Sequence, residues 1–119
     1  MTKKKTKYIV YNDSDNEFAL SSEALVWLAE RGVMGAYQLV NEIKSHSSSN
    51  TKIDNTMIGL ERHSAILALC IEELGTKAAS AHGSMIRVRK INGNMYLIKR
   101  SGAVETVLTP EELVWIKVD

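Results

Sequence analysis

An alternating pattern of apolar and polar residues near the start of the chain predicts a β-strand. Residues 7–12 alternate in this way and are rich in tyrosine and β-branched side chains, which favour strands. The polar run that follows, residues 12–18, predicts a turn. After this turn the apolar residues no longer recur at every second position but at the spacing of a helix.

Helical spacing of apolar residues predicts three helices. The first begins at Ser21, whose hydroxyl can accept a hydrogen bond from a free backbone N–H, and ends before Gly32, which can adopt the positive φ that closes a helix. The second spans residues 34–43, and the third spans 64–74 with Gly75 as its stop. Their predicted inward faces are Ala24, Leu25 and Leu28, then Tyr37, Val40 and Ile43, then Ile66, Leu67, Cys70, Ile71 and Leu74.

A period of two returns after residue 84. It predicts four more strands, over residues 85–91, 95–100, 103–108 and 113–118. The first two flank Asn92-Gly93-Asn94, a tight-turn signal that predicts a β-hairpin, and Thr109-Pro110-Glu111-Glu112 predicts one helical turn with a capping box. The predicted fold is α+β, with an antiparallel sheet of four or five strands and two or three helices packed on one face.

The composition predicts one domain over residues 1–119. The chain is 45% hydrophobic and 24% charged, which suffices for a core without metal or disulfides. We expect a flexible basic tail at 1–6 and a mobile polar loop at 45–55. The longest apolar run, 65–71, is far shorter than the ~20 residues that span a bilayer, and a single cysteine excludes an intramolecular disulfide. These features predict a cytoplasmic protein that does not bind membranes.

The charge of the chain is balanced overall but divided along its length. The net charge is +1, which argues against a protein that binds nucleic acid through general basicity. Residues 12–30 carry five acidic and no basic side chains, whereas 84–102 carry five basic and no acidic ones. The two segments either neutralise each other or leave a basic face for an anion. Tyr96 beside that face is a single aromatic residue, so nucleic acid binding is not expected.

Most catalytic signatures are absent from the sequence. No glycine-rich run ends in Gly-Lys-Ser or Gly-Lys-Thr, which excludes a phosphate-binding loop of that type. Residues 13–17 begin like a calcium loop, but Phe18 and Ala24 stand where that loop needs glycine and glutamate. The histidines are too far apart in sequence to predict a zinc site: His46, His63 and His82. We therefore expect no metal and no cofactor, and we favour binding over catalysis.

One constellation has the residue types for an anion site. Arg62 and His63 precede Ser64 at the start of the third predicted helix, where free N–H groups and cations can hold a phosphate or carboxylate. The alternative is that Glu61 pairs with Arg62 and the Ser64 hydroxyl caps the helix, which leaves His63 as a packed loop residue. An imidazole also suits acid–base chemistry at neutral pH. The full candidate ligand-binding set is Arg62, His63, Asn12, Asp13, Arg87, Arg89 and Arg100.

Three blocks of residues resemble a family of small proteins of phages, prophages and bacteria that has no assigned activity. The blocks are Tyr8-Ile-Val-Tyr-Asn-Asp13 with Phe18-Ala-Leu-Ser21 and Glu23-Ala24; Arg62-His63, Leu67, Glu72-Glu73-Leu74-Gly75 and Lys77-Ala78; and Tyr96, Gly102, Glu105, Thr109-Pro110 and Trp115. The family usually has a glycine pair in place of Asn16-Glu17 and aspartate in place of Ser64. The resemblance implies a phage-type source, supplies no reaction, and singles out Asn12, Asp13, Arg62, His63, Glu73 and Glu105.

Three classes of function follow from these observations. The first is a non-enzymatic accessory protein that binds a host or phage protein, for instance to counter a bacterial defence system, in the host cytoplasm. The second is a homo-oligomer that sequesters a small anionic nucleotide or signal molecule in pockets between its subunits. The third is an enzyme that acts on nucleotides or nucleic acid with His63 and Asp13 as acid and base. We expect the first.

Overall fold

The computed structural model of the protein describes residues 6–45, 52–113 and 116–118. Within these ranges the chain is a mixed α+β fold with four helices and four strands. The helices are α1 (Ser22–Glu30), α2 (Met34–Ser45), α3 (Ala65–Leu74) and α4 (Thr76–Ala79), and two short 3-10 helices are η1 (Thr56–Ile58) and η2 (Pro110–Glu112). The strands are β1 (Thr6–Asn12), β2 (Ile86–Asn92), β3 (Leu97–Ser101) and β4 (Val104–Leu108).

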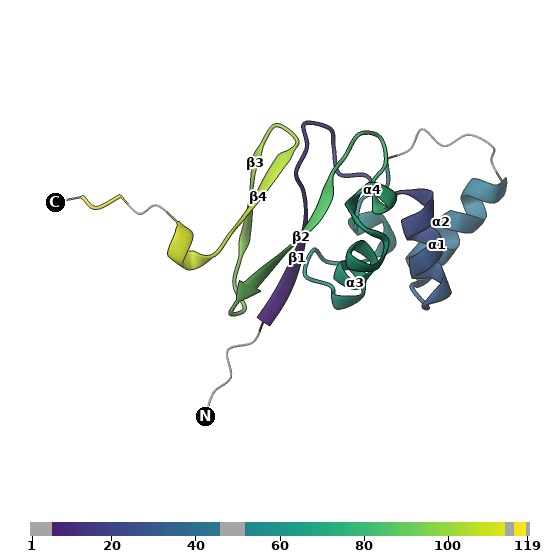
Figure 1. Cartoon of the computed structure of the whole chain (residues 1–119), viewed down its shortest axis with the longest axis horizontal. Helices are drawn as coiled ribbons and strands as arrows, with labels where there is room; N and C mark the ends of the chain where they lie inside the picture. Colours follow the sequence, from purple (N-terminus) through teal and green to yellow (C-terminus); the bar gives the residue numbers. More distant parts are fainter. Residues whose placement is uncertain (1–5, 46–51, 114–115, 119) are drawn as a thin grey trace, which may run out of the picture.

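The strands form two separate antiparallel pairs, β1 with β2 and β3 with β4. Figure 1 shows the helices on one side of β1–β2 and the β3–β4 hairpin on the other. Successive side chains of a strand point to opposite faces, so Val10 packs against the helices while Ile9 packs against the hairpin residue Val107. Two two-stranded sheets thus stand in place of the single sheet of four or five strands that the sequence predicts.

The predicted hairpin across Asn92-Gly93-Asn94 is wrong. β2 pairs with β1, and the tight turn of the fold is Gly102-Ala103, which joins the paired residues Ser101 and Val104. Gly102 has φ 63°, a positive value that glycine adopts easily and that this type of turn requires. The chain leaves β2 at residue 93 and crosses over, so that Val107 on the second hairpin strand can pack against Ile9.

Helix α1 forms as predicted. The Ser21 hydroxyl accepts a hydrogen bond from the Ala24 N–H at 3.0 Å, and Ala24, Leu25 and Leu28 are buried together with Trp27. Helix α3 also matches, because Gly75 ends it with φ 85°. Ser64 takes the N-cap position of α3, but within the described chain its side chain makes no capping hydrogen bond.

The predicted inward face of α2 is partly wrong. Tyr37 is 52% exposed, Ala36 is fully buried, and Val40 is partly buried. Gly35 lies so close to the backbone of Ile58 in η1 that an added Cβ would come within 2.6 Å of it. Because Gly35 and Ala36 are small, the backbone of α2 can approach the backbone of η1 on this face. Tyr37 then lies on the opposite, exposed face of α2. The side chain of Ile43 lies outside the described residues.

The remaining predictions concern the helical turn at residues 109–112, the two ends of the chain and the loop at residues 45–55. Glu112 accepts a hydrogen bond from the Thr109 N–H at 3.0 Å, which confirms the capping box. Leu113 and residues 116–118 are not in a strand, and 114–115 lie outside the described residues. Of the predicted tail and loop, 1–5 and 46–51 also lie outside them, while Ile53 and Asn55 are buried. None of the helices in the described ranges combines the length and hydrophobicity needed to cross a bilayer.

Candidate functional site

Arg62, just before α3, is the centre of a buried polar network. Its Nη1 and Nη2 donate to the two carboxylate oxygens of Glu105 at 2.5 and 2.9 Å, and its Nε donates to Asn55 Oδ1 at 2.6 Å. The Arg62 side chain is 11% exposed and that of Glu105 is 4% exposed. The guanidinium carbon also lies 4.1 Å from the ring centroid of Phe18. A bidentate pair of this kind fixes geometry as well as neutralising charge.

The same pair covers the edge of β1 that β2 leaves free. The Val10 N–H donates to the Arg62 carbonyl at 2.8 Å, and the Val10 carbonyl accepts from Arg62 Nη1 at 3.3 Å. Two residues further along, the Asn12 N–H donates to Glu105 Oε1 at 2.8 Å. An open strand edge invites another strand. Here an arginine and a carboxylate take the hydrogen bonds that a neighbouring strand would need, which explains why β4 lies beside β1 without joining its sheet.

Glu105 is held in its ionised form. Burial alone raises the pKa of a carboxyl group. In Glu105 this effect is outweighed by the hydrogen bonds from Arg62 and from the Asn12 N–H, and by the positive charges of Arg62 and Arg100, so its pKa is lowered. Arg100 Nε donates to Glu105 Oε2 at 3.2 Å. The carboxylate therefore has two arginines as partners and no free oxygen for a reaction.

Asn12 organises the turn after β1. Its side chain is fully buried. Its amide nitrogen donates to the carbonyls of Asn16 at 2.6 Å and Ala103 at 3.1 Å, and its amide oxygen accepts from the Met85 N–H at 3.1 Å. All of these partners are backbone groups of this chain, so Asn12 holds the polar turn, the start of β2 and the hairpin turn together.

His63 and Asp13 have separate partners. His63 is exposed, and its Nδ1 lies 2.8 Å from the Tyr96 hydroxyl, with the two rings edge to face. The Tyr96 pKa is raised, first by burial and then by the nearby Glu61 carboxylate, with Arg62 acting in the opposite direction. Asp13 Oδ2 lies 3.1 Å from Arg87 Nε in an ion pair without hydrogen-bond geometry. The two residues are not joined as an acid–base pair.

Every arginine of the predicted ligand set is ion-paired with a carboxylate of the same chain. Arg89 Nη2 lies 2.7 Å from Glu112, and its Nη1 donates to the Val107 carbonyl. The predicted alternative pairing of Arg62 with Glu61 is wrong, because the partner is Glu105. Arg62 and Glu105 lie far apart in sequence, so their spacing gave no sign that they would pair. Only the family resemblance pointed to Glu105.

The surface beside the network offers little to an anion. A hollow of about 230 Å³ borders the network. Its lining residues are Glu17, Phe18, Asp54, Arg62, Arg100, Gly102, Ala103 and Glu105. An anion in this hollow would meet three carboxylates as well as two arginines, both of which already pair with Glu105. In the described parts of the chain, no group of three or more His, Cys, Asp or Glu side chains is placed to hold a metal ion.

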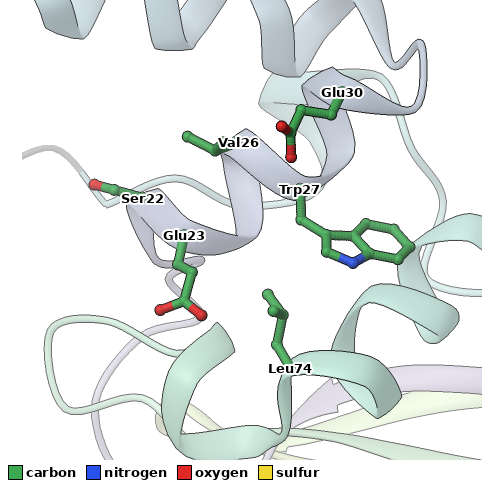
Figure 2. A pocket seen from close by; sticks show the side chains of 6 residues that line it. All are labelled: Ser22, Glu23, Val26, Trp27, Glu30 and Leu74. Atoms are coloured by element: carbon green, nitrogen blue, oxygen red, sulfur yellow. The ribbon is translucent and has the colours of Figure 1, made fainter.

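A second surface feature, an apolar groove, lies on α1. It has a volume of about 420 Å³ and is lined by Ser22, Glu23, Val26, Trp27, Glu30 and Leu74. Figure 2 shows Leu74 pointing from the end of α3 toward Trp27 and Glu23, while Val26 and Glu30 continue the surface along α1. Val26 is 42% exposed. No pattern in the sequence indicated this groove, because its two sides come from different helices.

Trp27 is a rigid part of this groove. The indole is mostly buried, and the Arg31 guanidinium carbon lies 3.7 Å from its ring centroid. Arg31 Nη1 also donates to the Trp27 carbonyl at 3.0 Å. Arg31 is thus engaged by Trp27 and is not among the residues that line the groove. The charged residues that do line it, Glu23 and Glu30, are both acidic.

Comparisons with known proteins add no relative. No protein-family model matches the chain, and neither a curated protein nor a solved structure does. The network and the groove are therefore interpreted from their own contacts, burial and charge.

Proposed function

We propose that this protein is a non-enzymatic accessory protein of phage type, which acts by binding a protein of the host or of the phage. The observation that carries the proposal is a contrast between two parts of the surface. The polar residues with the best chemistry for a reaction or an anion are engaged by groups of the same chain, whereas the apolar side chain of Val26 is open to solvent on α1.

The internal contacts support binding over catalysis. Arg62, Glu105 and Asn12 satisfy backbone groups of β1 and of the turns, so three of the six residues that the family resemblance singles out have a structural task. A general acid or base needs a free proton position within reach of a substrate. The Glu105 carboxylate is 4% exposed and already accepts from Arg62 and Asn12.

The exposed apolar residues support a protein partner. Val26 beside Trp27 forms an open apolar surface with room for a large side chain. Protein interfaces are centred on such surfaces, where an aromatic or aliphatic anchor enters a pocket and excludes water. We propose that the partner inserts such an anchor, and that the outcome is to block a bacterial defence system.

The anionic-ligand alternative ranks second. It requires cations that are free to meet a phosphate, but Arg62, Arg87 and Arg89 each face a carboxylate of this chain. A ligand would have to displace those partners and leave them unpaired, which costs binding energy.

Affinity purification of the tagged full chain from phage-infected bacteria tests the proposal. We expect one protein to co-purify in a fixed ratio and to form the same complex when both are purified and mixed. The protein should also raise the plating efficiency of a phage on cells that carry the targeted defence. Recovery of the chain alone, together with a rise in its melting temperature on adding nucleotides or cyclic dinucleotides, would instead support the anionic-ligand alternative.

A further inference from the structure

We infer that the groove between α1 and the end of α3 binds an apolar side chain of the partner that is flanked by lysine or arginine. This inference rests on the proposed function and specifies the chemistry of the partner. It is carried by two independent features of the groove, its apolar lining and the sign of its charge.

The apolar lining fits one large side chain. Trp27 and Leu74 face each other across the groove in Figure 2, and Val26 extends the apolar surface along α1. A volume of about 420 Å³ accommodates a leucine, methionine or phenylalanine side chain. Burial of such a group removes apolar surface from water on both partners, which is the main favourable term in association.

The residues that line the groove include two carboxylates, Glu23 and Glu30, and no cation. In the described residues no ion pair joins Glu23 or Glu30, whereas Asp13, Glu105 and Glu112 each have an arginine partner. Opposite charges across an interface increase the rate and specificity of association. Cationic side chains of a partner are therefore the complement that these two carboxylates lack.

The acidic end of α3 strengthens the charge argument. The end of α1 has a cation, since Arg31 follows Glu30 and donates to the Trp27 carbonyl, but no basic residue lies in the last turn of α3. Glu72 and Glu73 are exposed in the last turn of α3, next to Leu74. The C-terminal end of a helix carries partial negative charge, so acidic residues there are unfavourable in the free protein. A cationic partner would relieve this repulsion.

A selection of random short peptides on the full chain tests the inference. We expect the enriched peptides to carry a large apolar residue flanked by lysine or arginine. Binding of the synthesised peptides should fall about tenfold or more, roughly 1.4 kcal/mol, in Val26→Lys. Leu97→Lys on β3 is the matched control, because Leu97 is 41% exposed and Val26 is 42% exposed.

The charge component is tested separately. The double variant Glu23→Gln with Glu30→Gln should weaken binding and reduce its dependence on salt, since fewer charge pairs remain to be screened. Asp15→Asn with Glu61→Gln removes two exposed carboxylates elsewhere and should leave binding unchanged. Circular dichroism confirms that each variant is folded.

Three results would overturn the inference. The enriched peptides could lack basic residues, no peptide could be enriched, or binding could be insensitive to Val26→Lys. A fourth contrary result is self-association of the wild-type chain that Val26→Lys abolishes, because the groove would then be a contact between two copies of this chain. If a cellular partner co-purifies equally with wild type and Val26→Lys, the proposed function holds and this inference fails.

Discussion

Glu105 on β4 accepts hydrogen bonds from both terminal nitrogens of Arg62 and from the Asn12 N–H. One carboxylate therefore connects the hairpin, the segment before α3 and the edge of β1. The buried Arg62 and Glu105 charges are paired, and the backbone groups at the edge of β1 are satisfied by the carbonyl and side chain of Arg62 and by the Glu105 carboxylate.

Loss of the carboxylate should destabilise the fold. In Glu105→Gln the Arg62 guanidinium stays buried without a counter-charge, and breaking one partner of a buried pair costs about 3–5 kcal/mol. Urea unfolding followed by circular dichroism measures the change. The matched control is Glu73→Gln, an identical substitution at an exposed site, which should change the unfolding free energy by less than about 0.5 kcal/mol. Equal midpoints for the two variants would contradict the structural role.

The Arg62–Glu105 pair should make the free energy of unfolding depend on pH in the acidic range. The pKa of Glu105 is lowered in the folded state, whereas an unfolded glutamate titrates near about 4.3. Below that value the unfolded chain binds the proton more readily, so the stabilisation is complete above about pH 4.3 and is lost as the pH falls through the lower folded pKa. Unfolding free energies measured from neutral pH down to acid should show a shallower slope in Glu105→Gln than in wild type.

Asn12→Asp should be more harmful than its similar shape suggests. The amide nitrogen that donates to the Asn16 and Ala103 carbonyls becomes an oxygen, which repels them, and a second carboxylate would lie close to Glu105. We expect a loss of roughly 3 kcal/mol or more, from a buried charge with unmet hydrogen bonds. The melting temperature measures it, with the exposed Asn94→Asp as the control.

Gly35→Ala should destabilise the protein although alanine is the better helix former. The new Cβ would come within 2.6 Å of the Ile58 carbonyl oxygen, so α2 and η1 would have to separate. Overpacking costs about 1–3 kcal/mol, against a gain of up to about 1 kcal/mol in helix propensity. Chemical denaturation should show a net loss, whereas Gln38→Ala on the exposed face of α2 should not. A stabilised Gly35→Ala variant would contradict the close approach.

Cys70 should be unreactive in the native protein. Burial raises the pKa of its thiol to about 11, with the positive charge of Arg31 acting in the opposite direction. The thiolate is the reactive form, so iodoacetamide at mildly alkaline pH should modify Cys70 only after denaturant is added. Mass spectrometry follows the reaction, and rapid modification under native conditions would be contrary to the packing.

The local elements were largely predictable from the sequence. Ser21 and Gly75 bound helices because hydroxyl capping and positive φ are properties of single residues and their neighbours. The alternation of residues 7–12 likewise predicts β1, which spans Thr6–Asn12. Where a prediction failed, a distant contact had decided the outcome: Ala36 replaced Tyr37 on the inner face of α2 because Gly35 allows η1 to approach.

The candidate sites depended on tertiary structure. The sequence indicated Arg62 as a residue with chemistry but gave no means of choosing its partner, because Glu105 reaches it only after β4 is placed beside β1. The groove has the same origin, since Val26 and Leu74 belong to different helices.

The sequence by itself determined the bounds of α1 and α3 and the place of β1 to within about one residue, because capping and periodicity act over a few residues. The tertiary structure decided which strands pair and which charges meet. The pairing of β1 with β2, and the Arg62–Glu105 bridge at the free edge of β1, join segments that the chain holds far apart. Their energies depend on burial and distance, which only the folded chain defines.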